Sequence, residues 1–347
     1  MRAAARIALW VATVSGCGGA PPVPGDPADL VALGRKLFFD TALSADGQVS
    51  CASCHRPERA YSDGLALAIG ARGRHGTRNT PSLLDVRGQH SLFWDGRRDR
   101  LEAQALDPLL NEVEHGLPDE AHLLAALQAD ARYGAAFQAA YGNVADRITS
   151  QHVGEALAAF ERTLESGPSP FDRFRAGRSD ALPEAARRGW AIFDQHAHCT
   201  RCHLATGDGD HPMFTDHRFH SLSIGFAKIE RDLPGLSQRL VALRADGRSL
   251  ARAIPIDPAI AELGRFVVTL DPADLAAFKT PGLRDVALTA PYMHDGSVAT
   301  LAEAVDLEVY SRGKGHDVPL ILTPAERDDL VSFLRALSAD RGGATIR

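Results

Sequence analysis

Two copies of the five-residue pattern C-x-x-C-H constrain this chain more than any other feature. The first copy spans residues 51–55 and the second spans residues 199–203. C-x-x-C-H is the attachment signature of a c-type haem, because the two thiols bond to the vinyl groups on one porphyrin edge and the adjacent histidine then reaches the iron. The sequence therefore predicts two covalent haems, held by Cys51, Cys54 and His55 and by Cys199, Cys202 and His203.

Other uses of paired cysteines fit this spacing poorly. A zinc ribbon places its two C-x-x-C pairs roughly 15–20 residues apart, whereas these pairs begin at residues 51 and 199. A thioredoxin-like redox pair does not need the trailing histidine. A haem-free metal-binding module is therefore the least favoured interpretation.

Composition excludes further classes of protein. The chain has 347 residues, of which 45% are hydrophobic, and a formal net charge of −6. This length favours about two domains, and the hydrophobic content is ordinary for a globular protein. The acidic balance argues against nucleic acid as a partner.

Residues 1–16 have the features of an export signal, because Arg2 and Arg6 precede a short apolar run. The run ends in Val-Ser-Gly-Cys, which resembles a bacterial lipobox, so we expect Cys17 to be lipidated; a plain secretory signal is the alternative. The Gly- and Pro-rich stretch that follows predicts a flexible tether over residues 17–28. We therefore expect a periplasmic or cell-envelope protein that contacts the membrane only through a lipid anchor.

Repeated patterns extend over both halves of the chain. T-P-x-L-x-D-V occurs at residues 80–86 and again at 280–286. Each half reads G-x-x-[LI]-F, then C-x-x-C-H, then this pattern, then D-G. Four shared patterns in one order predict an internal duplication, with two tandem cytochrome c-like domains over residues 29–166 and 167–347.

The expected fold is mainly α. Apolar residues at three- and four-residue spacing over 153–164 predict a helix, and a capping box at 323–326 predicts the start of another. The segment Gly-Pro-Ser-Pro at 167–170 ends the first pattern and marks the domain boundary. Residues 55–79 and 203–279 are expected to form long, Gly-rich loops around the haems.

Together these patterns resemble the bacterial di-haem cytochrome c peroxidase family, which includes MauG. The resemblance covers nearly all of the mature chain and implies that hydrogen peroxide reacts at the haem of His55, while the haem of His203 transfers electrons. It is carried by the first C-x-x-C-H and by L-S-A-D-G at 43–47, R-N-T-P at 78–81, F-W-D-G-R at 93–97 and P-Y-M-H-D-G at 291–296.

The resemblance also implies roles for individual residues. Trp94 corresponds to the aromatic residue between the two haems, with core packing as the alternative. Gln104 and Glu114 correspond to the distal acid–base group that moves the protons of peroxide cleavage. Both could instead be ordinary surface residues, and Glu112 could be confused with Glu114; His115 replaces the family's usual methionine.

A calcium ion between the domains is also implied. Its ligands would be the side chain of Asn79 and the carbonyls of Thr289 and Pro291, oxygen donors that suit a hard cation. Asn79 could instead be a simple turn residue. Members of the family are often dimeric, so a homodimer is among the expected states.

At the first haem the chain departs from the family's usual pattern. Where many members have a second histidine that closes the sixth coordination position, this chain has Ala71. His75 follows four residues later, out of register. We therefore expect the first haem to be five-coordinate and open.

At the second haem, the place of the family's usual methionine ligand holds Glu308. A two-residue insertion would bring Tyr310 into register with the tyrosine ligand of MauG, so Tyr310 is the expected distal ligand; Met213 and His316 are alternatives. An anionic oxygen ligand stabilises oxidised iron, whereas methionine raises the potential. Tyr310 would therefore help this haem to store oxidising equivalents.

The leading hypothesis is an exported di-haem peroxidase that takes electrons from a small cytochrome c or copper protein. The second is a MauG-like enzyme that uses peroxide to oxidise side chains of a protein partner; Ala197, at the place of MauG's surface tryptophan, counts against it, and Trp190 is expected in the core. The third is a non-enzymatic electron carrier or redox sensor, which would have no need of a distal acid–base group.

Overall fold

The computed structural model describes residues 27–142, 148–205, 211–245, 247–313, 320–339 and 345–346. Over these residues the protein is mainly helical, and its strands are two residues long, which confirms the expectation of a mainly α fold. None of the described helices is long and apolar enough to cross a membrane. The signal at 1–16, the lipidation site Cys17, most of the tether and His316 lie outside the described residues.

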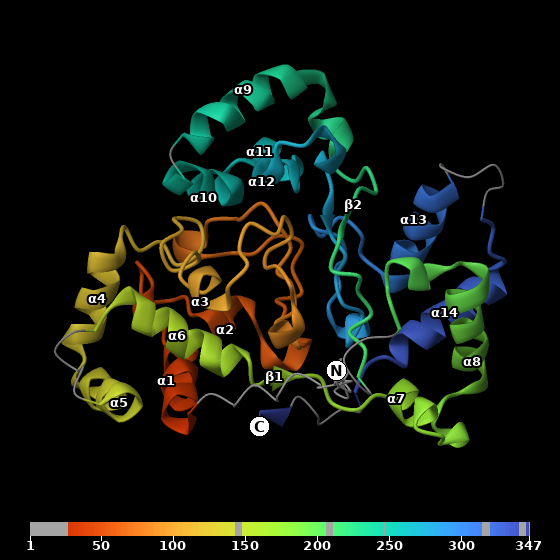
Figure 1. Ribbon diagram of the computed structural model, residues 1–347, viewed down its shortest axis with the longest axis horizontal. Helices are drawn as coiled ribbons and strands as arrows, with labels where there is room; N and C mark the ends of the chain where they lie inside the picture. The colour runs from red at the N-terminus through yellow and green to blue at the C-terminus, as the bar shows by residue number, and fades with distance from the viewer. Residues whose placement is uncertain are drawn as a thin grey trace, which may run out of the picture.

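The N-terminal lobe, on the left of Figure 1, is built around the crossing of α1 and α6. Gly34 allows this crossing to be close, because a Cβ there would lie 1.8 Å from the carbonyl oxygen of Ala156. Phe38 and Phe160 pack edge to face across it, with ring centroids 5.1 Å apart. The helices of this lobe are α1 (Ala28–Phe39), α2 (Cys51–Cys54), α3 (Leu101–Gln104), α4 (Glu120–Ala129), α5 (Ala131–Tyr141) and α6 (Ser150–Glu161).

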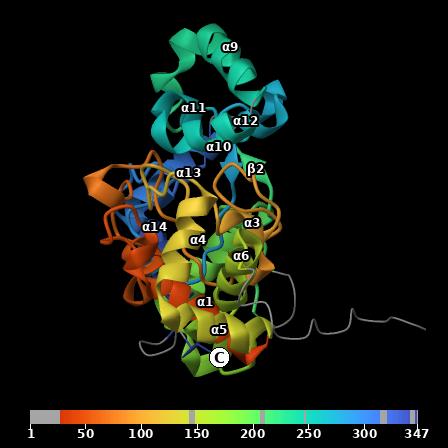
Figure 2. The same ribbon diagram turned by 90° about the vertical axis from the view of Figure 1, so that its left-hand side faces the viewer.

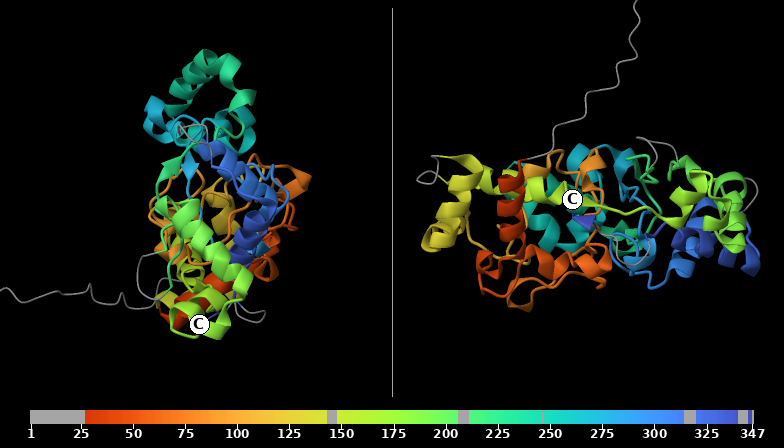
Figure 3. Two further views of the ribbon diagram at one scale, coloured as in Figure 1. Left: turned by 90° about the vertical axis from the view of Figure 1, so that its right-hand side faces the viewer. Right: turned by 90° about the horizontal axis from the view of Figure 1, so that it is seen from below.

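The C-terminal lobe uses the same type of crossing between α8 and α14. A Cβ on Gly189 would lie 1.9 Å from the carbonyl oxygen of Asp329, and the rings of Phe193 and Phe333 lie 5.0 Å apart. The two lobes lie side by side when seen from below (Figure 3). The helices here are α7 (Pro170–Arg175), α8 (Glu184–Ala191), α13 (Leu301–Gly313) and α14 (Pro324–Arg335).

A third group of helices covers the N-terminal lobe (Figures 1 and 2). The expectation of a long loop over residues 203–279 is therefore wrong in part, because Leu236, Leu240 and Ile260 belong to an apolar cluster of their own. The hydroxyl of Thr77 donates to the carbonyl of Ile254 at 2.8 Å and ties the group to the lobe beneath. These helices are α9 (Leu233–Arg244), α10 (Gly247–Ile256), α11 (Pro258–Glu262) and α12 (Phe266–Thr269).

The strands tie distant parts of the chain together. β1 (Leu164–Glu165) pairs with β4 (Thr345–Ile346), and β2 (Phe219–His220) pairs with β3 (Phe278–Lys279), both antiparallel. The apolar cluster of the N-terminal lobe ends at Leu164 and that of the C-terminal lobe begins at Phe171. The predicted domain boundary between residues 166 and 167 lies between these two apolar clusters, and it stays a prediction.

Candidate functional site

Both C-x-x-C-H motifs line a single cavity of about 610 Å³ that lies where the two lobes meet. None of the four cysteines in these motifs forms a disulfide. Six side chains with the chemistry of haem attachment therefore face one space: Cys51, Cys54, His55, Cys199, Cys202 and His203.

The two motif histidines are oriented in the same way. Nδ1 of His55 donates to the carbonyl of Tyr61 at 2.9 Å, and Nδ1 of His203 donates to the carbonyl of Phe214 at 2.9 Å. A carbonyl can only accept, so each Nδ1 carries the proton and each Nε2 keeps its lone pair for a metal. Burial lowers the pKa of His55, which favours the neutral ring. Two thiols and one oriented imidazole at each motif fit a haem.

Glu114 lies in the part of the cavity that belongs to the first motif, together with Gln104 at the end of α3. Burial raises the pKa of Glu114 to about 7, with the charge of Asp107 adding to the rise and that of Arg97 opposing it. A carboxyl with a pKa near neutrality can both accept and donate a proton. The alternative candidate Glu112 points outward and lies 3.6 Å from Arg74 at the surface.

Neither Ala71 nor His75 lines the cavity. Ala71 is buried and its backbone N–H donates to the carbonyl of Glu114 at 2.7 Å, while His75 is exposed. Among the described residues of the N-terminal lobe, His115 is the other imidazole in the cavity wall. Its Nδ1 donates to the carbonyl of Leu43 at 2.8 Å, and its Nε2 lies 3.8 Å from Sγ of Cys51. His115 therefore lies beside the first thiol of the first C-x-x-C-H motif.

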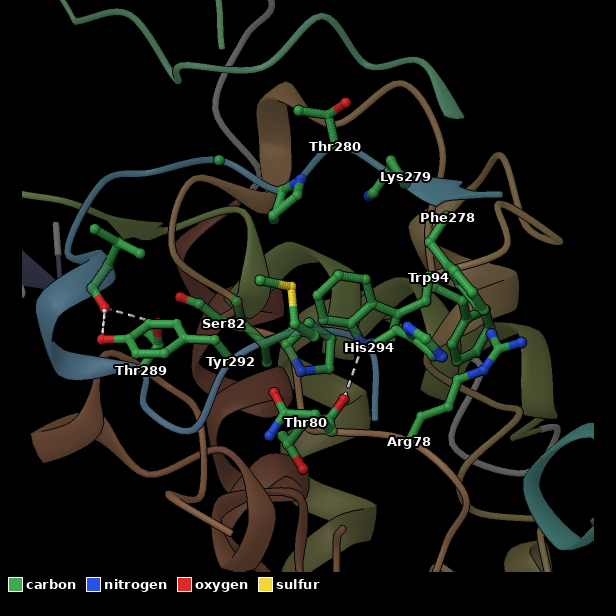
Figure 4. A pocket seen from close by; sticks show the side chains of 18 of the residues that line it. Arg78, Thr80, Ser82, Trp94, Phe278, Lys279, Thr280, Thr289, Tyr292 and His294 are labelled. Atoms are coloured by element: carbon green, nitrogen blue, oxygen red, sulfur yellow. Dashed lines mark hydrogen bonds between the residues drawn. The ribbon is translucent and has the colours of Figure 1, made fainter. Parts of the chain in front are cut away.

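Trp94 lies in the wall of the cavity at the seam between the lobes (Figure 4). Its indole Nε1 donates to the carbonyl of Asn79 at 2.9 Å, and its own carbonyl accepts from the backbone N–H of Lys279 at 2.9 Å. The ammonium of Lys279 donates to Gln89 and to the carbonyl of Ser91, and burial lowers its pKa to about 8. Backbone contacts from both lobes thus hold Trp94 in place.

Asp95 forms a buried ion cluster that sequence reasoning missed. Its carboxylate is fully buried and pairs with Arg78 at 2.7 Å and Arg97 at 2.9 Å. Arg78 also donates to the carbonyl of Ala261 at 2.7 Å, and Arg265 donates to the carbonyl of Asp95 at 3.1 Å. In the sequence, Asp95 stood out only within the F-W-D-G-R and repeated D-G patterns, which do not show that Arg78 and Arg265 fold back onto it.

The expected calcium ligands Asn79, Thr289 and Pro291 all line this cavity. Asn79 is buried, its side-chain N–H donates to the carbonyl of Leu65 at 2.8 Å, and its backbone N–H donates to the carbonyl of His294 at 2.8 Å. Asn79 therefore bridges the two lobes. The calcium site itself stays a prediction.

The candidate ligands of the second haem lie in different surroundings. Tyr310, on α13, is 63% exposed and does not line the cavity, whereas Glu308 on the same helix does. Met213 lines the cavity next to Phe214, the residue that orients His203. The expectation for Tyr310 does not match the direction of its side chain here, since it faces away from the cavity.

Two further expectations concern possible surface relays. Trp190 packs against Phe171 and Phe333 in the core of the C-terminal lobe, with ring centroids 4.9 and 5.3 Å away. Ala197 is also buried. Neither position offers an exposed aromatic ring.

Comparison with known proteins identifies relatives over most of the chain. Residues 28–180 match the family model described as di-haem cytochrome c peroxidase. The methylamine utilization protein MauG of Methylorubrum extorquens is 36% identical over 91% of this chain and 80% of its own length. A cytochrome-c peroxidase of Denitromonas iodatirespirans is 35% identical over 91% and 84%. The crystal structure of a MauG-like protein associated with microbial copper homeostasis superposes with a TM-score of 0.73 at 30% identity, covering 95% of this chain and 96% of that one.

Proposed function

The chain belongs to the di-haem cytochrome c peroxidase family, and on that basis we propose that it reduces hydrogen peroxide to water with electrons from a small redox protein. The observation that carries this proposal is the half-buried Glu114, with its pKa raised to about 7, in the cavity that the first C-x-x-C-H motif also lines. An electron carrier or sensor would have no use for such a group.

Peroxide reduction consumes two electrons and two protons and releases two molecules of water. When bound, the first haem supplies the iron at which the O–O bond breaks. Glu114 takes the proton from the first peroxide oxygen and returns it to the leaving oxygen, and the amide of Gln104 orients the substrate by hydrogen bonding. His55 would hold the iron through its Nε2, because its Nδ1 donates to the carbonyl of Tyr61.

A haem held by His203 would supply electrons to the haem held by His55. Trp94 is the aromatic side chain at the seam, and we propose that it provides an intermediate stop for them. Its indole N–H donates to a carbonyl, that of Asn79. A carbonyl is a poor proton acceptor, so an oxidised Trp94 keeps its proton and electron movement through it needs no proton transfer.

A second candidate function is the oxidation of side chains on a protein partner. It is favoured by the position of Ala71, where no imidazole closes the first haem, and by the similarity to MauG and to a MauG-like protein. The buried Ala197 counts against a relay at that position. A donor-driven peroxidase therefore remains the first candidate.

The remaining features are proposed on the same basis. We propose that both haems are attached covalently, that the two lobes arose by duplication, and that Asn79, Thr289 and Pro291 hold calcium. The matching glycine crossings at Gly34 and Gly189 support the duplication. Export to the periplasm, with Cys17 lipidated, rests on the sequence of the first residues.

The test is peroxide-dependent oxidation of a pre-reduced small cytochrome c by the haem-loaded, fully oxidised enzyme, with no activating reductant. Rapid turnover supports the peroxidase and an open first haem. If peroxide instead produces a long-lived oxidised spectrum and the cytochrome c is not oxidised, the peroxidase proposal is wrong and oxidation of a protein partner becomes the first candidate.

A further inference from the structure

The ion cluster at Asp95 holds more positive than negative charge. Arg78 and Arg97 both donate to Oδ2 of Asp95, at 2.7 and 2.9 Å, so two guanidinium groups share a single carboxylate. The side chain of Asp95 is fully buried, and those of Arg78 and Arg97 are 10% and 14% exposed. The carboxylate balances one of the two charges, so an excess positive charge stays where water reaches poorly, which costs free energy.

Neighbouring carboxylates do not remove this excess. Glu262 is close enough to raise the pKa of Arg78, but its own carboxylate pairs with Lys228 at 3.1 Å. Burial nevertheless lowers the pKa of Arg78, as expected of a cation whose charge is incompletely balanced. Glu114 feels the charge of Arg97, but burial raises the pKa of Glu114 to about 7, so this carboxyl is partly neutral at neutral pH.

Both arginines also have a buried donor without an acceptor. Nε of Arg78 and Nε of Arg97 are buried and have no hydrogen-bond partner among the described residues. Nη2 of Arg78 donates to the carbonyl of Ala261 at 2.7 Å. Arg78 lies over the ring of Phe278, 5.3 Å from its centroid, and Arg97 lies 3.4 Å from that of Phe93. Each guanidinium is therefore held in one direction and still offers an N–H group to an acceptor.

The two side chains line the cavity that both C-x-x-C-H motifs also line. Arg78 precedes Asn79, whose carbonyl accepts from the indole of Trp94, and Arg97 follows Trp94 by three residues. Figure 4 shows Arg78 and Lys279 with Trp94 at this seam. Lys279 lines the cavity as well, and its ammonium donates to neutral oxygens. This part of the cavity therefore favours an anion.

We propose that Arg78 and Arg97 form a carboxylate-binding site in the cavity, beside Trp94. A carboxylate there supplies the missing negative charge and accepts from the guanidinium groups, in hydrogen bonds about twice as strong as neutral ones. Haems carry such groups as their propionates, and a free small carboxylate has the same chemistry. The inference rests on the proposed two-haem function. A guanidinium beside a propionate also destabilises ferric iron, which raises the midpoint potential of that haem.

The experiment records the propionate bending band of the holoprotein by resonance Raman spectroscopy, because hydrogen bonds to a propionate shift this band. Arg97→Gln and Arg78→Gln should each shift the band and lower the midpoint potential of one haem in a redox titration. Arg97→Lys keeps the charge but loses the planar set of donors, so it should shift the band and leave the potential close to the wild-type value.

Arg265→Gln is the matched control. Arg265 donates to the carbonyls of Asp95 and Gly96 but does not line the cavity, so its loss should leave the band unchanged. If the glutamine variants do not fold, Arg97→Lys gives the same comparison of bands, because a lysine can still pair with Asp95.

A second measurement identifies the source of the carboxylate. Acetate, compared with chloride at equal ionic strength, should not raise the thermal unfolding midpoint of the holoprotein if propionates fill the site. A rise that Arg97→Gln abolishes, with the propionate band unchanged in every variant, would assign the site to a free carboxylate. No band shift and no effect of acetate would overturn the inference.

Failure of this inference and failure of the proposed function are distinguishable. Two haems and a propionate band that depends on Arg97, without oxidation of cytochrome c, contradict the peroxidase alone. Full turnover, with an unchanged band and no effect of acetate, contradicts the carboxylate site alone.

Discussion

At the scale of single residues, the first haem site depends on one carboxyl with unusual surroundings. Burial raises the pKa of Glu114 to about 7, and Gly70 lets the backbone pack closely enough to hold it there, since a Cβ at Gly70 would lie 2.1 Å from the carbonyl oxygen of Val113. A proton-transfer group works best when its pKa lies near the working pH. The chemistry of this site therefore depends on burial more than on any charged neighbour.

Replacing Glu114 with Gln removes this proton-transfer group and keeps its size. The reaction of the oxidised enzyme with peroxide should slow by about 10²–10⁴-fold, measured by stopped-flow absorption, with both haems retained. Glu112→Gln is the matched control, because Glu112 is exposed, and it should react at the wild-type rate. Equal rates for the two variants would remove Glu114 from the mechanism.

The rate of the same reaction should increase with pH. Glu114 must be deprotonated to accept the peroxide proton, so the rate should rise from pH 5 to about 7, the pKa of its carboxyl, and level off above. Burial also raises the pKa of Glu161, another cavity-lining carboxyl, to about 8. In Glu114→Gln, the rate of reaction with peroxide should no longer rise between pH 5 and about 7. In Glu161→Gln, this rise should be unchanged.

At the scale of helices, the two lobes depend on close crossings at one glycine each. Gly34 faces the backbone of α6 and Gly189 faces that of α14, and any side chain there would overlap a carbonyl. Each crossing positions a phenylalanine near the histidine of a C-x-x-C-H motif, since the ring centroids of Phe38 and His55 are 6.5 Å apart and those of Phe193 and His203 are 6.4 Å apart. Helix packing thus helps to set the positions of the two motif histidines.

Alanine at either crossing should destabilise the holoprotein. Overpacking of this kind typically costs about 1–3 kcal/mol, so Gly34→Ala and Gly189→Ala should each lower the midpoint of thermal unfolding. The matched control is Gly134→Ala in α5, where a Cβ meets nothing within 4 Å. Helix propensity there predicts a gain of about 0.5–1 kcal/mol. A gain at all three positions would contradict the crossings described above.

At the scale of the whole molecule, the N-terminal lobe and the helices that cover it are joined at Asp95. Burial alone would raise the pKa of Asp95, but the charges of Arg97 and Arg78 outweigh burial and hold that pKa below its usual range. Arg78 and Arg265 extend the contact to the helices that cover the N-terminal lobe. The stabilisation is present above the ordinary pKa of an aspartate and is lost as the pH falls through the lower folded value.

Asp95→Asn should leave two arginines without their shared counter-charge. Removing one partner of a buried ion pair typically costs about 3–5 kcal/mol, measurable by denaturant unfolding of the holoprotein. Asp306→Asn, at an exposed pair with Arg327, should cost about 0–1 kcal/mol. If both variants lose a similar amount of unfolding free energy, the buried cluster at Asp95 stabilises the protein no more than an exposed ion pair does.

The calcium proposal is also tested on the whole molecule. Treatment with a calcium chelator should lower the thermal unfolding midpoint and slow electron transfer between the haems, and added calcium should restore both. Asn79→Ala should weaken the response to calcium. If chelation changes neither property, Asn79 acts only through its hydrogen bonds to Leu65 and His294.

The sequence predicted well those elements whose defining residues are close together in the chain. The C-x-x-C-H motifs, the helix over 153–164 and the capping box at Thr323 depend on residues within a few positions of one another, and the structure has helices at Ser150–Glu161 and Pro324–Arg335. The helices of 233–269 were missed. The apolar residues that make them helical pack mainly against one another, in a cluster separate from both lobes.

The sequence by itself predicted two haem sites, since covalent attachment of a c-type haem needs two thiols and a histidine at fixed spacing. The family resemblance singled out Trp94, Gln104 and Glu114, and all three line the cavity. Only the tertiary structure decided that Glu308 and not Tyr310 faces the cavity, and that Asp95 meets arginines from positions 78, 97 and 265. The direction of a side chain depends on helix rotation and on partners distant in the chain, which local spacing does not encode.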